Sequence, residues 1–71
     1  IPKEIFGIFS LSISLNLSHN SLSGTIPSEV GSLKILDGLD FSENHLSGEL
    51  PGTFGGCSSL EILFLAGNSF Q

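Results

Sequence analysis

The chain has 71 residues, with two basic and seven acidic side chains, a formal net charge of −5 and one cysteine. This charge excludes nucleic acid as a partner, because phosphate binding requires clustered Lys and Arg, and it argues against contact with an anionic membrane surface. One cysteine cannot form an internal disulfide, and together with two histidines it has no recognised ligand spacing. We therefore expect no metal and no cofactor.

A period of 24 residues organises the sequence. Apolar residues recur at this offset in three sets, namely Leu15, Leu39 and Leu63; Leu17, Phe41 and Leu65; and Leu22, Leu46 and Phe70. Because an apolar residue returns at each of these positions while the residues between them vary, the pattern predicts stacked structural units.

A short strand is predicted in each unit, near residues 13–18, 38–42 and 62–66. In the first two units apolar and polar residues alternate, as in a half-buried strand. The third unit departs from this pattern because Phe64 is apolar at an outward position. One such strand cannot bury its leucines alone, so we expect parallel pairing with the next unit at about 4.8 Å.

The first unit contains one additional residue. The separation between Pro2 and Asn20 is one residue longer than that between Pro27 and Asn44. We therefore predict a single-residue bulge within residues 11–15, before the first strand.

An asparagine follows each predicted strand, where the chain turns inward. Its amide both donates and accepts hydrogen bonds, so it can satisfy the backbone groups of this turn. We assign Asn20, Asn44 and Asn68 to a structural asparagine ladder. Gly24 and Gly48 then allow a backbone bend that a side chain would obstruct.

The remaining half of each unit is predicted to form the outer side. Pro27 and Pro51 fix an extended entry to it. Residues 28–30 predict a short 3₁₀ or helical turn, with Ser28 or its neighbour as the capping residue. From this outer side Val30 and Phe54 are expected to point inward.

The runs Leu22–Pro27 and Leu46–Pro51 resemble the Leu-Ser-Gly-x-Ile-Pro signature of plant-specific leucine-rich repeats. The resemblance covers essentially the whole chain. It implies an α/β-type solenoid, a right-handed superhelix with a parallel concave β-sheet, a second short strand in each unit and a convex side of short 3₁₀ turns and loops. Residues 1–71 would form a single segment of about three units, uncapped and part of a longer ectodomain.

A finer resemblance involves Leu15–Asn20, Gly55–Leu63 and Gly67–Gln71, which are similar to late repeats of immune receptor kinases such as the rice bacterial-blight resistance receptor group. It implies a plasma-membrane receptor-like serine/threonine kinase whose extracellular side recognises a protein or peptide ligand or a co-receptor ectodomain. The kinase would lie outside these residues, so the segment itself is expected to be no enzyme. A secreted polygalacturonase-inhibiting type of inhibitor and a kinase-less receptor-like protein are the alternatives.

Candidate ligand-binding residues occupy outward strand and turn positions of the expected concave face. They are His19, Asp37, Asp40, Glu43, Glu61 and Phe64. The carboxylates suit a basic peptide or a partner receptor, with Phe64 as an apolar anchor. Alternatively, the charges only keep an exposed face soluble. A glycosidase pair is rejected because an open curved sheet provides no cleft in which a carboxyl pKa is raised.

Three other features carry chemistry. Asn16-Leu17-Ser18 is an acceptor sequence for N-glycosylation. Cys57 occupies the position of Leu33 in the preceding unit and is expected to be a small buried apolar residue. His19 and His45 lie on exposed turns, where each is either a solvated side chain or a sensor of acidic pH.

Overall fold

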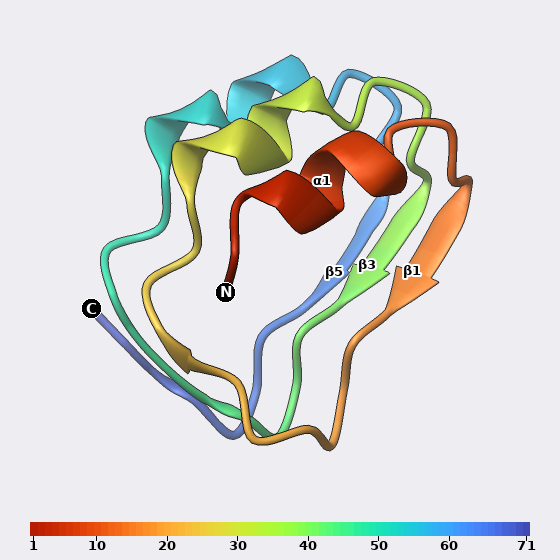
Figure 1. The fold of residues 1–71 in the computed structure, drawn as a ribbon. Helices are drawn as coiled ribbons and strands as arrows, with labels where there is room; N and C mark the ends of the chain where they lie inside the picture. The colour runs from red at the N-terminus through yellow and green to blue at the C-terminus, as the bar shows by residue number, and fades with distance from the viewer.

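The computed structural model describes residues 1–71, which wind into successive turns of a coil (Figure 1). Strands β1 (Ser14–Asn16), β3 (Gly38–Asp40) and β5 (Ile62–Phe64) form a parallel sheet in the order β1-β3-β5. Leu39 pairs with Leu15 on one side and with Leu63 on the other, so neighbouring strands are offset by one unit. The predicted parallel solenoid is confirmed.

A second parallel sheet follows the first in each turn. It consists of β2 (Ser23–Gly24), β4 (His45–Gly48) and β6 (Ser69–Phe70). Gly24 and Gly48 have φ values of +80° and +79°, a left-handed conformation that glycine adopts without a Cβ clash. These strands confirm the second short strand implied by the repeat signature.

Three short helices form the wall opposite the main sheet, α1 (Glu4–Ile8), η1 (Ser28–Ser32) and η2 (Gly52–Gly56) (Figure 1). The 3₁₀ helix η1 begins after Pro27, and its capping position makes no side-chain hydrogen bond. The expected side-chain cap is therefore absent. None of the three helices has the length and apolar character of a bilayer-crossing segment.

The additional residue of the first unit lies before α1, and residues 11–15 contain no bulge. Helix α1 begins at Glu4 and η1 at Ser28, the same offset that relates their strands. Pro2 consequently stands two residues before its helix, as Ile26 does. The prediction was wrong because it aligned the two prolines, whereas Lys3 adds a helical residue (φ −64°, ψ −24°) ahead of α1.

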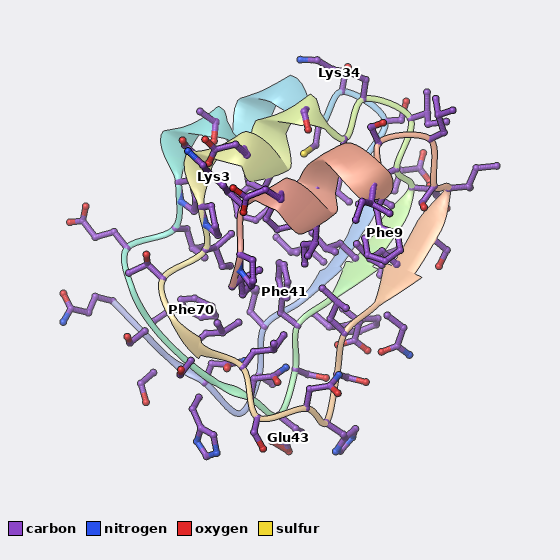
Figure 2. The ribbon with its side chains drawn as sticks, viewed as in Figure 1. Lys3, Phe9, Lys34, Phe41, Glu43 and Phe70 are labelled. Carbon is purple, nitrogen blue, oxygen red and sulfur yellow. The ribbon has the colours of Figure 1, made fainter.

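The middle unit forms the core because neighbouring units cover it on both sides. Its fully buried side chains are Val30, Leu33, Leu36, Leu39, Phe41 and Leu46. Figure 2 shows Phe41 in the interior between the sheet and the helices. Equivalent side chains in the third unit, such as Leu63 and Leu65, are only half-buried. At the other end Ile8 and Leu11 are exposed, so burial depends on having a stacked neighbour.

Asn44 connects the first unit to the second. Its Nδ2 donates to the carbonyl oxygens of Leu17 and Phe41, both at 2.9 Å, and its Oδ1 accepts from the backbone N–H of Leu22 at 3.1 Å. The side chain is 5% exposed. A single amide thereby satisfies backbone groups in two adjacent turns.

Asn68 repeats these contacts one turn later. Its Nδ2 donates to the Phe41 carbonyl oxygen, and its Oδ1 accepts from the Leu46 N–H, both at 2.9 Å. Asn20 is exposed and donates only to carbonyl groups of its own turn. Within residues 1–71 the hydrogen bonds between turns therefore come from Asn44 and Asn68.

Close helix packing depends on Gly31. A Cβ atom at this position would lie 2.7 Å from the carbonyl oxygen of Thr53 and 2.9 Å from its Cβ. The Thr53 hydroxyl donates to the Ser28 carbonyl oxygen at 2.7 Å, which fixes η2 against η1. Since backbone atoms cannot yield as a flexible side chain does, Gly31 sets the distance between the two helices.

We expect Gly31→Ala to lower the free energy of unfolding, measured by urea denaturation, by about 1–3 kcal/mol through overpacking. Gly55→Ala is the matched control, because Gly55 has the same place in η2 and a Cβ there would meet nothing within 4 Å. The control should be neutral or stabilise by up to about 1 kcal/mol. Equal losses in the two variants would contradict this account of the helix spacing.

Asn44→Ala should destabilise the chain by about 1–3 kcal/mol, because it leaves the Leu22 N–H without a partner and removes the bonds from Asn44 to the Leu17 and Phe41 carbonyl oxygens. Asn20→Ala provides the comparison, since it removes the same amide from an exposed position. Thermal or urea unfolding of both variants measures the difference. The ladder would not be the main connection between turns if Asn20→Ala cost as much as Asn44→Ala.

Candidate functional site

The concave face consists of the outward-facing side chains of β1, β3 and β5. Because successive strand residues face opposite sides of a sheet, the residues on either side of buried Leu39 lie on this outer face. Two rows of paired residues cross it: Ser14, Gly38 and Ile62 in one, and Asn16, Asp40 and Phe64 in the other. The chemistry of the face is set by these two rows.

An apolar surface lies on β5. Ile62 is 49% exposed and Phe64 is 55% exposed. Phe64 was predicted as an anchor, whereas Ile62 was missed as a candidate, although its position two residues earlier places it on the same face. Gly38 lies beside Ile62, and the only heavy atom near a Cβ added there would be Ser14 Oγ at 3.9 Å. The backbone is therefore bare next to the apolar pair.

Asp40 is fixed in the adjacent strand. Its Oδ1 accepts from the Ser42 hydroxyl at 2.6 Å and from the Ser42 N–H at 2.9 Å. The Ser42 hydroxyl, the Ser42 N–H and the nearby charge of His19 together lower the pKa of Asp40 below its usual value. Its second oxygen makes no hydrogen bond within the chain, so an ionised carboxylate is available to a partner.

The same turn occurs one unit earlier with an amide. Asn16 Oδ1 accepts from the Ser18 hydroxyl at 2.6 Å and from the Ser18 N–H at 2.9 Å. Ser42, which positions Asp40, was not among the predicted site residues. The detectable signal was a polar residue two positions before a serine, repeated at the unit offset. Because the turn accepts either side chain, Asp40→Asn should remove the charge and keep the geometry.

The other candidate carboxylates lie outside the two rows and do not converge. Asp37 and Glu61 lie together where their strands start, with the Glu61 N–H donating to the Asp37 carbonyl oxygen at 2.9 Å. Asp37 and Asp40 are three residues apart, about 10 Å along a strand. No three His, Cys, Asp or Glu side chains are placed to hold a metal ion. The carboxylates therefore supply a distributed negative potential.

His19 and Glu43 belong to the bend that follows the strands. Both adopt left-handed backbone conformations, with φ values of +54° and +56°, and Gly67 has the equivalent place with +76°. The Glu43 carboxylate lies against Gly67, filling the space a Cβ would need. Figure 2 shows Glu43 at this bend. Neither residue joins the two rows formed by the strands.

Both lysines of the chain lie on the helix side of the molecule. Lys3 precedes α1 and Lys34 follows η1 (Figure 2). The main sheet therefore has one carboxylate in its strands, Asp40, and two directly before them, Asp37 and Glu61, with no lysine or arginine among these residues. This separation gives the face a negative potential that favours a basic partner.

Cys57 and Asn16 have separate environments. Cys57 is 6% exposed, its Sγ lies 3.2 Å from the Val30 carbonyl oxygen, and burial raises the pKa of its thiol. A buried, protonated thiol is a packing residue. Asn16 is exposed, and its amide nitrogen makes no hydrogen bond within the chain. That nitrogen is the atom to which an N-linked glycan would attach.

The candidate site is an open surface, because the chain contains no pocket. Small molecules bind mainly in concave pockets that enclose most of their surface. A curved sheet with an apolar pair and a charged surround instead fits the surface of a macromolecule.

A family model described as leucine rich repeat matches residues 13–70. No curated protein matches the chain. The fold is similar to a chain in the crystal structure of the BIR3–SERK2 complex from Arabidopsis thaliana, with a TM-score of 0.94 and 37% identity. That similarity covers 100% of this chain and 38% of that one.

The chain is also similar to the leucine-rich repeat ectodomain of the receptor kinase SOBIR1 from Arabidopsis thaliana. The TM-score is 0.82 at 38% identity, covering 93% of this chain and 36% of that one. The present chain therefore spans well under half the length of either structural neighbour. The family match over most of the sequence and the stacked turns lead to one conclusion: the chain belongs to the leucine-rich repeat family.

Proposed function

We propose that this chain is a non-catalytic extracellular recognition segment of a plant receptor-like kinase, and that its concave face binds a protein or peptide ligand or a co-receptor ectodomain. The observation that carries the proposal is the position of exposed Ile62 and Phe64 beside the fixed carboxylate of Asp40. An apolar centre with a polar rim is the usual anatomy of a protein interface.

The arrangement of side chains supports binding over simple solvation. Charged side chains would suffice to keep the face soluble, yet Phe64 places an aromatic ring where the first two units have Asn16 and Asp40. An exposed apolar pair on one strand marks an interaction surface. The candidates Asp37 and Glu61 extend the negative potential around it, and His19 and Glu43 border it at the bend.

The structural neighbours support the receptor assignment. SOBIR1 is described as a receptor kinase with a leucine-rich repeat ectodomain, and BIR3 and SERK2 are described as a complex. A membrane anchor, a kinase domain and a role in defence are parts of the proposal. The assignment to the rice bacterial-blight resistance receptor group rests on Leu15–Asn20, Gly55–Leu63 and Gly67–Gln71. The coding sequence downstream would distinguish a kinase from a kinase-less receptor or a secreted inhibitor.

Partner binding tests the proposed face. We expect Phe64→Ala and Asp40→Lys each to weaken association with a receptor-kinase ectodomain about tenfold, equivalent to about 1.4 kcal/mol. The measurement is biolayer interferometry against a panel of plant receptor-kinase ectodomains that includes SERK2 and SOBIR1. Leu11→Ala is the control, because it removes an 83% exposed apolar side chain outside the concave rows. Binding to no ectodomain, or an equal loss with Leu11→Ala, would reject the proposal.

Passage through the secretory pathway predicts a glycan on Asn16. When the chain is expressed in plant cells with a secretion signal, treatment with peptide:N-glycosidase A should increase its gel mobility. Ser18→Ala should abolish the shift, and Ser18→Thr should retain it, because the acceptor sequence requires Ser or Thr at that position. A shift that persists in Ser18→Ala would assign the glycan to another site and refute glycosylation of Asn16.

A further inference from the structure

We infer that the partner's anchor on this face is an arginine side chain flanked by an apolar residue, with the guanidinium held between Asp40 and Phe64. The inference rests on the proposed function and names the chemistry of the occupant. It follows from the position of a fixed anion beside an exposed aromatic ring, next to bare backbone and a second apolar side chain.

Asp40 and Phe64 are direct neighbours in the parallel register of β3 and β5. The Phe41 N–H donates to the Phe64 carbonyl oxygen at 2.9 Å, so the two strands are tightly paired at this level. Paired strands lie about 4.8 Å apart, and a cation is attracted by an aromatic face within about 6 Å of the ring centre. A single guanidinium can therefore lie over the ring and reach the carboxylate.

The carboxylate is oriented before a partner arrives. Ser42 holds one oxygen of Asp40 with two hydrogen bonds, which leaves the other oxygen to accept an N–H from outside. Neither lysine neutralises it, because Lys3 and Lys34 lie on the helix side (Figure 2). His19 is the one basic group whose charge acts on it, from the bend. A partner cation thus meets an unpaired, preorganised anion.

Arginine fits these two contacts better than lysine. The planar guanidinium is weakly hydrated and can stack on a ring while its edge donates to a carboxylate. The ammonium of lysine is a compact, strongly hydrated charge that does not present a flat face. Because Phe64 is 55% exposed, a stacking plane has access to its ring.

The adjacent row indicates what flanks the arginine. Gly38 has no side chain and no close neighbour on this face, so a partner's main chain can approach the backbone there. Ile62, 49% exposed, borders this bare backbone and offers a contact for an apolar residue. Asp37 and Glu61 directly precede Gly38 and Ile62 where the strands start, and they disfavour an acidic segment. An extended segment with an arginine and a flanking apolar residue can therefore contact the Asp40–Phe64 pair and Ile62 together.

A pair of peptides that differ only in charge tests the anchor. The full chain is produced in bacteria, so that neither Asn16 nor an asparagine introduced at position 40 carries an N-glycan. It is immobilised for biolayer interferometry and titrated with the peptide Ser-Gly-Leu-Arg-Leu-Gly-Ser, or with the same peptide that has neutral, nearly isosteric citrulline in place of arginine. We expect the arginine peptide to bind about three- to tenfold more tightly, the range for a partly exposed cation–π contact with an ion pair.

Three variants assign that preference to its source. Asp40→Asn should abolish it while preserving the turn, since Asn16 makes the same two hydrogen bonds in the first unit. Phe64→Leu should reduce the preference but retain apolar contact. Glu49→Gln is the control, because it removes an equal charge from an exposed residue beyond β4, outside the concave rows, and should leave the preference unchanged.

The outcomes separate this inference from the proposed function. Equal binding of both peptides, or an arginine preference that survives Asp40→Asn, would overturn the arginine anchor. If both peptides bound equally and Phe64→Ala abolished both, the apolar docking face would stand without that anchor. Binding of neither peptide would also reject the anchor, and the ectodomain measurement would then decide the proposed function independently.

Discussion

The structure depends on each turn burying its inward side chains against the turns on either side. Leu39 and Phe41 are almost completely buried because units stack on both sides of them, whereas Leu63 has a neighbour on one side only. The asparagine ladder makes this stacking specific. An amide of one turn bonds to the Leu17 carbonyl of the turn before it, so a shift by one residue would break a hydrogen bond as well as expose a leucine. Burial supplies the driving force, and the ladder supplies the register.

The inward turn also requires a residue in the left-handed backbone conformation, and that residue is not always a glycine. His19 and Glu43 adopt left-handed conformations just before their asparagines, and Gly67 occupies the third equivalent position. For a residue with a Cβ this conformation costs about 1–2 kcal/mol. After Glu43 the hydrogen bonds that Asn44 makes to the preceding turn offset this cost, whereas Asn20, after His19, bonds only within its own turn. Two of the predicted binding residues are therefore constrained by the bend before any partner is considered.

The period could be predicted from sequence because stacking forces an apolar or amide side chain to recur at each inward position. The missed features have a different origin. The additional residue near Pro2 was misplaced because proline marks an extended entry without fixing its distance from the helix. The role of Ser42 was missed because a turn hydrogen bond is local and outward, where no periodic burial constrains the residue type. Ile62 was missed because one apolar residue on an outward position acquires meaning only beside Phe64 and Gly38.

These differences follow from how a solenoid divides its sequence between scaffold and surface. Stacking restricts the residue type at inward positions. At outward positions the backbone is equivalent in every turn, but the side chain can differ. Asn16, Asp40 and Phe64 occupy equivalent places, yet they present an amide, an anion and an aromatic ring in a single row. No one unit contains both members of the proposed recognition pair. Asp40 and Phe64 become neighbours only because the register places residues one period apart side by side. The stacking that folds the chain therefore also determines which side chains lie next to each other on its surface.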